Sequence, residues 1–224
     1  VSKMDKLVQT ALEVVELLKN DFSAAIQDIE QIVTTRKRDH TLVTELDFRI
    51  EKKIRQLLSI KTPNIPILGE EEGADDNFAG TGWVVDPVDG TRAFLYGMPT
   101  FGMLLSYVEE YEPIFGLMHF PAIDRTIYAM TGMGCFDKTT LGTIQVKLKR
   151  PVIPLDDAVI SLSGLHSSDI YLADGSYPYK ISNLIGKVKD LVFINDCYQH
   201  AMVATGRIDC AIDTLMKPWD SAAI

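Results

Sequence analysis

The segment WVVDPVDGT, residues 83–91, carries the most information in this 224-residue chain. An apolar run typical of a buried strand ends in two aspartates, Asp86 and Asp89, around a proline that stops the strand. Carboxylate oxygens are the ligands that hard divalent cations prefer, so the pair predicts a metal site at the strand end. Gly90 and Thr91 follow, where a turn or helix start presents backbone N–H groups that suit a phosphate. The simpler alternative is an Asx-turn, in which the aspartates only bind turn amides.

Two helices are predicted before this strand. Apolar residues recur at roughly helical spacing over residues 4–34, which favours one long or kinked helix. A second helix is expected to begin near Thr44 and to end before Pro63. Thr44 and Asp47 fit a capping box in which aspartate replaces the usual glutamate, and this structural role is enough to explain both residues.

After residue 65 the pattern changes to short apolar runs separated by turn residues. We expect a meandering antiparallel sheet that starts with IPIL and closes at the glycine-rich TGMGC, residues 131–135. The second half predicts strands at 144–148, 158–164, 191–195 and 208–213, and helices at 198–206 and from Asp220 onward. Helices before and after a sheet, then a second β/α section, indicate an α+β fold rather than a doubly wound parallel sheet. We place a division between residues 1–138 and residues 139–224.

Composition and charge exclude several classes of partner. The formal net charge of −9 disfavours nucleic acid, whose binding needs clustered Lys and Arg, and the short basic run Arg36–Arg38 is explained by a solvated turn. No apolar run approaches the ~20 residues that span a bilayer, and the N-terminus predicts a helix rather than a signal peptide. Cys135, Cys197 and Cys210 are too few and too scattered for a disulfide framework or a zinc site. They indicate buried thiols of a reducing compartment, and we expect the cytoplasm.

Two further acidic segments add candidate metal ligands. Glu70 lies in LGEEEG directly after the run IPIL, so it ends a strand as Asp86 does, although three consecutive acids are usually a solvated loop. Asp220 lies in KPWDSAA and fits the N-cap of a helix, where a simple capping role is the alternative. A carboxylate at a helix start can also reach a nearby cation.

Together these segments resemble the inositol monophosphatase family of magnesium-dependent, lithium-sensitive phosphatases. The motifs occur in the order T-x-x-D, G-E-E, W-x-x-D-P-x-D-G-T and W-D-x-A-A, and they cover nearly the whole chain. The resemblance implies an α+β stack of alternating helical and sheet layers, an αβαβα sandwich. A family-length chain would continue past Ile224, so we expect this one to be truncated there.

The resemblance also implies a role for each matching residue in the hydrolysis of a small phosphomonoester by metal-activated water. Two Mg²⁺ ions would be held by Glu70, Asp86, Asp89, Asp220 and the carbonyl of Val88, with a third, weaker ion against Glu70. Phosphate oxygens would be bound at Asp89 and the amides of Gly90 and Thr91. Asp47, Glu70 and the Thr91 hydroxyl would act on the attacking water. A homodimer is consistent with the resemblance, because family members are often dimers.

Substrate choice is expected to depend on the second half. The resemblance places Asp213, seven residues before Asp220, and Asp196 near the leaving group. Two acids there suit sugar hydroxyls or a cationic amine, and the D-C-Y segment favours the histidinol-phosphate phosphatase branch. Asp196 as a plain cap of the helix beginning at Tyr198 is the alternative. The leading substrates are histidinol phosphate and inositol 1-phosphate. Alternative substrates are 3′-phosphoadenosine 5′-phosphate and fructose 1,6-bisphosphate. The non-enzyme alternative is an inactive metal-binding interaction protein.

Overall fold

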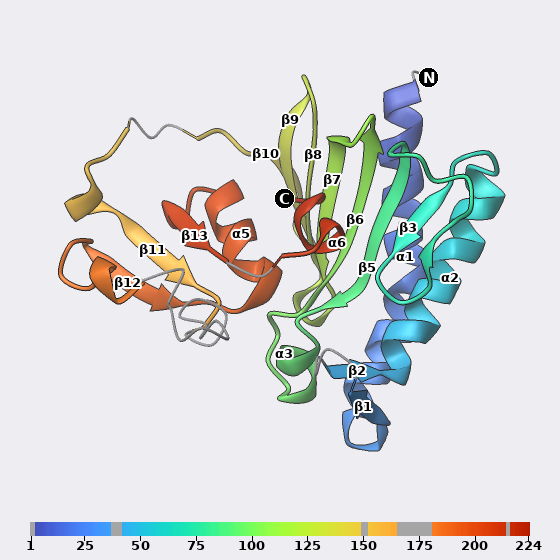
Figure 1. Ribbon diagram of the computed structural model, residues 1–224, viewed down its shortest axis with the longest axis horizontal. Helices are drawn as coiled ribbons and strands as arrows, with labels where there is room; N and C mark the ends of the chain where they lie inside the picture. Colours follow the sequence, from blue (N-terminus) through green and yellow to red (C-terminus); the bar gives the residue numbers. More distant parts are fainter. Residues whose placement is uncertain (1–2, 37–41, 149–151, 165–180, 214–215) are drawn as a thin grey trace, which may run out of the picture.

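Eight strands form the largest sheet of the computed structural model (Figure 1), which describes residues 3–36, 42–148, 152–164, 181–213 and 216–224. In chain order the strands are β3 (Ile67–Gly69), β4 (Gly73–Ala74), β5 (Gly82–Asp89), β6 (Gly102–Glu109), β7 (Glu112–Phe120), β8 (Arg125–Met130), β9 (Gly134–Thr139) and β10 (Gly142–Gln145). Across the sheet they follow the order β10-β9-β8-β7-β6-β5-β3-β4. Every neighbouring pair is antiparallel except β3 and β5, which run parallel.

Two long helices, α1 (Lys3–Gln27) and α2 (Glu45–Lys61), cover one face of this sheet (Figure 1). Their apolar stripes pack on alternate residues of the strands, and the resulting main core is built around the fully buried Trp83, Phe22 and Phe115. The Trp83 and Phe115 rings meet edge to face, with centroids 6.2 Å apart. Because successive strand residues point to opposite faces, the remaining apolar residues of β6 to β8 are available to a second layer.

The opposite face of the sheet packs against α5 (Asp196–Ala204) and α6 (Pro218–Ser221). Leu104, Met118 and Ile127 of the sheet form one cluster with Ala201 of α5 and Ala223 next to α6. Beyond α5 lies a parallel sheet of β11 (Val159–Leu162), β12 (Asp190–Phe193) and β13 (Cys210–Ile212), in the order β12-β11-β13. The succession of helices, sheet, helices and sheet confirms the predicted α+β layered sandwich.

The first helix is shorter than the spacing of apolar residues predicts. It ends at Gln27, a short 3₁₀ turn covers Ile29–Gln31, and β1 (Thr34–Arg36) then pairs antiparallel with β2 (Leu42–Thr44). The prediction of helix to residue 34 is therefore wrong at its end. The run of β-branched residues 32–35 favours extended backbone over helix, which explains the change.

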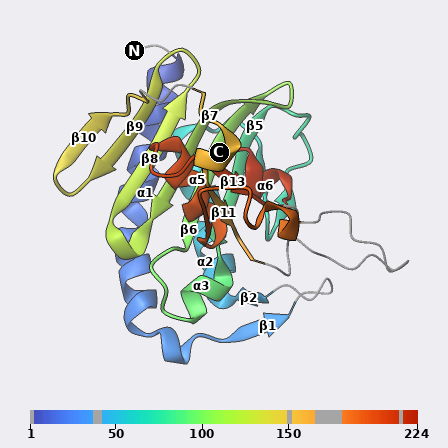
Figure 2. The ribbon, with the colours of Figure 1, turned by 90° about the vertical axis from the view of Figure 1, so that its left-hand side faces the viewer.

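The predicted meander is wrong at both of its ends. The run IPIL contributes β3, which pairs parallel with β5 because the β4 strand lies between them in sequence and turns the chain back. The segment TGMGC does not close the sheet, since it forms the turn between β8 and β9, with φ of +79° at Gly132. The β9–β10 hairpin extends the sheet beyond it (Figure 2). The strand predicted at 144–148 is wrong over most of its length, because β10 ends at Gln145 and residues 146–148 are not in a strand.

None of the described helices is long and apolar enough to cross a membrane.

The predicted division between residues 138 and 139 falls within β9, and the large sheet continues to Gln145. Whether the two parts are separate domains stays a prediction.

Candidate functional site

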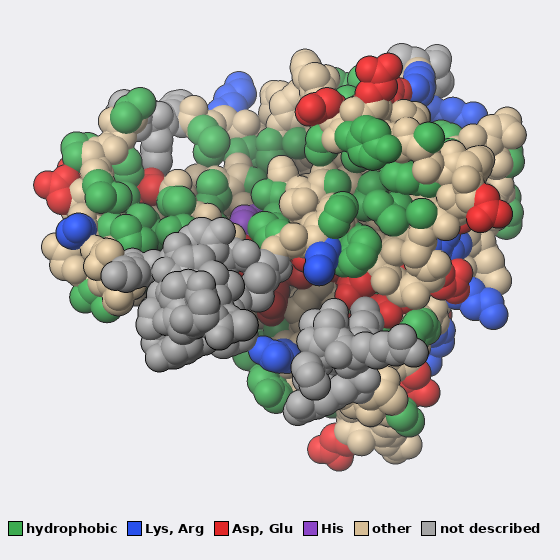
Figure 3. Space-filling model, viewed as in Figure 1, with side chains coloured by type: hydrophobic (Ala, Val, Ile, Leu, Met, Phe, Trp, Pro, Cys, Tyr) green, Lys and Arg blue, Asp and Glu red, His purple; other side chains and the backbone are tan. Residues whose placement is uncertain are grey.

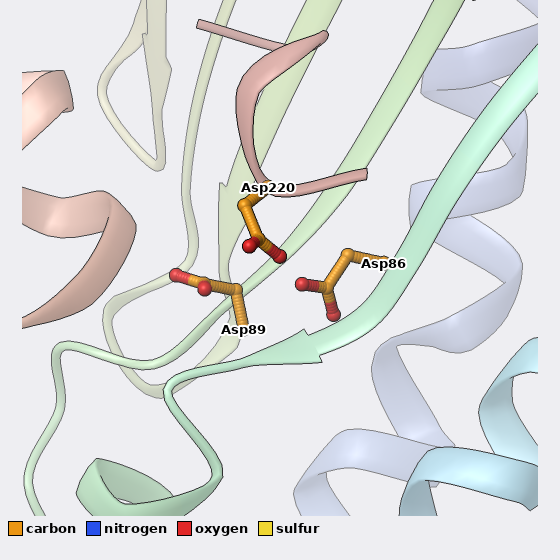
Figure 4. Close-up of side chains that lie close together, drawn as sticks. All are labelled: Asp86, Asp89 and Asp220. Carbon is orange, nitrogen blue, oxygen red and sulfur yellow. The ribbon is translucent and has the colours of Figure 1, made fainter. Parts of the chain in front are cut away.

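Asp86 and Asp89 lie at the end of β5, where the pairing with β6 becomes irregular. The irregularity follows from Pro87, which has no N–H for the ladder. Asp86 is 1% exposed, and its Oδ1 accepts the N–H of Val88 at 3.0 Å. The Asx-turn alternative is thus correct for one oxygen of Asp86, while the carboxylate as a whole still points toward Asp89 and the C-terminal helix (Figure 4).

Asp220 reaches these aspartates from the other end of the chain. One carboxylate oxygen each from Asp86, Asp89 and Asp220 lies within 4.8 Å of the other two. The side chains of Asp86 and Asp220 point toward each other, whereas the Asp89 carboxylate is turned toward α5, where it accepts the Cys197 N–H (Figure 4). The helix α6 can approach because Gly116 of β7 has no side chain: a Cβ there would overlap the backbone of Ala223. Segments about 130 positions apart in sequence therefore meet at one point.

The predicted helix start at Asp220 is wrong by three residues. Lys217 is the N-cap of α6, and Asp220 is the third helical residue, whose Oδ2 accepts the Lys217 N–H at 2.7 Å. Pro218 at the first helical position explains the earlier start, because proline is favoured there. One oxygen of Asp220 stabilises the helix end and the carboxylate still joins the cluster.

Glu70 is brought to the same place by the parallel pairing of β3 and β5. Gly69 pairs with Val85, and the Glu70 N–H donates to the Val85 carbonyl at 3.1 Å, so Glu70 and Asp86 leave the sheet side by side. The charge of Glu70 contributes to the raised pKa of Asp86, of Asp47 and of Asp220. Its charge therefore acts on Asp86, Asp47 and Asp220, although Glu70 is not one of the three residues whose carboxylate oxygens lie within 4.8 Å of one another.

Asp47 and Thr91 meet on the side of α2. The predicted capping box is confirmed: Asp47 Oδ2 accepts the N–H of the N-cap residue Thr44 at 2.9 Å. The other oxygen, Oδ1, lies 3.3 Å from the Thr91 hydroxyl, which is also 3.3 Å from the Val88 carbonyl. The structural and the functional interpretations of Asp47 are compatible, because each uses a different oxygen.

Gly90 shapes the turn between the strand and α3 (Thr91–Leu95). It is the N-cap of this short helix with φ of +81°, a conformation that suits glycine. A Cβ at this position would lie 2.7 Å from Asp196 Oδ2, so the turn and the start of α5 are in direct contact. The predicted phosphate-binding turn and the predicted substrate residue thus lie side by side.

Asp196 is the first residue of α5, with φ of +53°, and Asn195 is the N-cap. The alternative in which Asp196 caps a helix starting at Tyr198 is therefore wrong. The Oδ2 atom of Asp196 is buried and has no hydrogen-bond partner in the described part of the chain. Burial and the charge of Asp213 raise the pKa of Asp196 to about 6. Asp213 itself accepts the hydroxyl of Ser163 at 2.8 Å.

The carboxylates destabilise one another's charged forms. Burial and the charge of Glu70 raise the pKa of Asp86 well above its usual range, while burial and Asp196 raise the pKa of Asp89 to about 8. Burial also raises the pKa of Asp220 to about 6. Within the described residues, none of these three aspartates forms an ion pair with Lys or Arg. A cluster of buried acidic oxygens without a cationic side chain fits a divalent cation.

Acidic side chains are visible in a hollow between the large sheet and the part that carries the small sheet (Figure 3). The model of the Inositol monophosphatase family matches residues 1–224. The chain belongs to the inositol monophosphatase family. It is therefore related to phosphomonoester hydrolases that use divalent metal ions, as the motifs predict, and its hollow is the candidate active site of this family.

Relatives and solved structures agree with this assignment. The chain is 34% identical over 192 residues to a histidinol-phosphatase of Chlorobaculum parvum, and the matched region covers 84% of this chain and 69% of the relative. It is 28% identical over 195 residues to an inositol-1-monophosphatase of Bacillus subtilis, covering 85% of this chain and 70% of the relative. A lithium-chloride-soaked crystal structure of staphylococcal inositol monophosphatase-1 has the same fold, with a TM-score of 0.82, 23% identity, and coverage of 100% of this chain and 80% of that one.

The sequence did not predict three residues beside the site. Glu51 and Arg55 of α2 hold the loop after Glu70, and the Cys197 N–H at the start of α5 donates to Asp89 Oδ2 at 2.6 Å. The spacing Asp47, Glu51, Arg55 was an available signal, since residues four apart lie on one helix face. The Cys197 contact leaves no such signal, because it involves only a backbone group. The side chains of Arg36–Arg38 lie outside the described residues.

Proposed function

We propose that this chain is a magnesium-dependent phosphatase that hydrolyses a small phosphomonoester, with histidinol phosphate as the leading substrate. The observation that carries the proposal is the convergence of Asp86, Asp89 and Asp220, whose carboxylate oxygens lie within 4.8 Å of one another. Acidic side chains so close together repel one another unless cations lie between them. Hard cations with oxygen ligands, of which Mg²⁺ is the usual partner of phosphate esters, satisfy that requirement.

The available oxygens would hold two to three Mg²⁺ ions. Glu70, Asp86 and the Val88 carbonyl would supply one set of ligands, and Asp86, Asp89 and Asp220 would supply a second. When bound, the ions supply positive charge to the phosphoryl oxygens and to the leaving alkoxide, and they lower the pKa of water. The protein supplies fixed positions for these oxygens through the hydrogen bonds from Val88, Cys197 and Lys217.

The side chains around the ligands orient the reactants. Asp47 Oδ1 accepts the Thr91 hydroxyl, so the lone pairs of the Thr91 oxygen are free to accept a hydrogen bond from the attacking water. As the water loses its proton to the Thr91 oxygen, the hydroxyl proton of Thr91 passes to the Asp47 carboxylate. The N–H groups of Gly90 and Thr91, at the left-handed turn, bind phosphoryl oxygens. The mechanism requires no covalent phosphoenzyme, because the nucleophile is water.

The alcohol side of the substrate faces Asp196 and Asp213. Asp196 has a buried oxygen without a partner among the described residues, and it lies against Gly90 beside the phosphate-binding turn. An ammonium group pairs with such a carboxylate at short range, and histidinol phosphate carries one. The higher identity to a histidinol-phosphatase, 34%, than to an inositol-1-monophosphatase, 28%, supports the same choice. Inositol 1-phosphate is the second candidate, since its hydroxyls can donate to the same acids.

A substrate panel tests the proposal. Phosphate release from histidinol phosphate, inositol 1-phosphate and 3′-phosphoadenosine 5′-phosphate is measured with and without Mg²⁺ and with LiCl. We expect magnesium-dependent, lithium-inhibited activity that is highest with histidinol phosphate. Asp196→Asn should weaken kcat/KM for histidinol phosphate more than for inositol 1-phosphate. Magnesium binding without hydrolysis of any of these esters would instead support an inactive metal-binding protein.

Cellular location and assembly belong to the same proposal. The three cysteines are free thiols in the structure, which supports a reducing compartment and hence the cytoplasm. A homodimer stays a prediction from the family resemblance, and light scattering of the purified chain measures it directly.

A further inference from the structure

A buried carboxylate that belongs to neither set of proposed metal ligands lies behind the loop that carries Glu70. The side chain of Glu51, on α2, is 0% exposed. Its Oε2 accepts the N–H of Glu71 at 2.7 Å and its Oε1 accepts the N–H of Glu72 at 3.0 Å. A buried carboxylate that receives two backbone N–H groups holds those groups strongly, because hydrogen bonds to a charged acceptor are stronger than neutral ones.

Arg55, one helical turn further along α2, completes the arrangement. Its Nε donates to Glu51 Oε1 at 3.0 Å, and its guanidinium also binds the Gly73 carbonyl and, at 2.9 Å, Asp75 Oδ1. Asp75 in turn accepts the N–H of Ile67, at the start of β3, at 2.9 Å. The chain from Glu71 to Asp75 is therefore bonded to α2 through Glu51 and Arg55.

Contact on the other side of Glu70 is equally close. A Cβ built on Gly69 would lie 2.5 Å from the Glu51 Cδ and 2.8 Å from an Arg55 nitrogen, so only glycine fits without a shift. Glu70 thus stands between Gly69, which touches the Glu51 carboxylate, and Glu71, which is hydrogen-bonded to it. The pairing of β3 with β5 places the Glu70 backbone, and Glu51 holds the residues on either side of it.

We propose that Glu51 and Arg55 are positioning residues that hold the Glu70 carboxylate in its metal-binding position. This inference rests on the proposed function, in which Glu70 is a metal ligand. One face of α2 then carries Asp47, which contacts Thr91, and one turn later Glu51, which fixes the Glu70 loop. Groups that orient metal ligands typically change metal affinity or activity by about 10- to 100-fold when they are replaced.

The test uses Glu51→Gln, because glutamine keeps the size of the side chain but presents an NH₂ group to one of the N–H donors. Glu45→Gln is the matched control: the same change on an exposed residue of the same helix. Mg²⁺ binding is measured by titration calorimetry, amide exchange of residues 70–72 by mass spectrometry, and folding by circular dichroism. Gly69→Ala disturbs the same contact from the other side if Glu51→Gln fails to fold.

We expect Glu51→Gln to weaken Mg²⁺ binding about tenfold and to speed amide exchange in the loop, with Glu45→Gln unchanged. Activity at saturating Mg²⁺ should return to within about twofold, because the ligand itself is still present. Unchanged Mg²⁺ affinity in Glu51→Gln, when Glu70→Gln loses affinity, would overturn this inference and leave the proposed function intact. Unchanged affinity in Glu70→Gln would instead remove Glu70 from the proposed metal site.

Discussion

Replacement of Gly90 by alanine separates the role of the phosphate-binding turn from ordinary backbone strain. Gly90 has φ of +81°, and a non-glycine residue in the left-handed region costs roughly 1–2 kcal/mol. A Cβ there would also lie 2.7 Å from Asp196 Oδ2 and 3.0 Å from its Cβ, whereas ordinary contacts begin at 3.4 Å. The turn and the start of α5 must then separate by several tenths of an ångström.

Gly97 provides the control within the same segment. It has φ of +70°, but a Cβ added there would meet no atom within 4 Å. Gly90→Ala and Gly97→Ala should therefore both lower the free energy of unfolding by about 1–2 kcal/mol. Only Gly90→Ala should displace the reacting groups, and a misplacement approaching 1 Å reduces rates by up to about 100-fold.

The assay compares kcat/KM on histidinol phosphate for the two variants, with urea unfolding as the measure of stability. We expect kcat/KM to fall about 10- to 100-fold in Gly90→Ala and less than about twofold in Gly97→Ala. Equal activities in the two variants would show that the Gly90 turn does not position substrate, and the reasoning would be refuted.

Three further results are expected. The pKa values of Asp89 and Asp220 are raised in the folded state, so the folded, metal-free chain binds more protons than the unfolded chain between pH 4 and 8, and its stability should fall as pH rises. The increase in Tm caused by Mg²⁺ should therefore be larger at pH 8 than at pH 6. Equal increases at the two pH values would contradict this prediction. Asp86→Asn keeps an acceptor for the Val88 N–H and removes a buried charge, so calorimetry without metal should show a higher Tm and assays should show no turnover. Thr91→Val should reduce kcat by about 100- to 10,000-fold in steady-state assays, whereas Thr91→Ser, which keeps the hydroxyl, should stay within about tenfold.

Local signals in the sequence were sufficient for part of this site. The strand that carries Asp86 and Asp89 and the capping box of Thr44 and Asp47 depend on neighbouring residues, and both are confirmed. The expectation that Pro87 stops the strand is wrong, because β5 continues to Asp89 with only an irregularity in its pairing. The family resemblance added the distant Asp220, which the structure places beside Asp86 and Asp89. The inositol monophosphatase family and its layered α+β fold are likewise confirmed.

The remaining features depend on contacts between distant segments, which local patterns do not encode. The parallel pairing of β3 with β5 requires the intervening β4 strand, and this pairing sets Glu70 beside Asp86. The left-handed backbone of Asp196 and its contact with Gly90 join residues more than 100 positions apart, which local sequence patterns do not indicate. Glu51 looks like an ordinary helix residue until the loop it binds is present.

The proposed function depends on divalent cations shared by the carboxylates of β5 and of α6, near the C-terminus. A crystal structure of the chain with Mn²⁺ in place of Mg²⁺ tests it directly, since anomalous scattering locates the ion. The account predicts an ion within about 2–2.5 Å of oxygens of Asp86, Asp89 and Asp220 at once. An ion bound elsewhere, or an Asp220 carboxylate turned away from the other two, would contradict it.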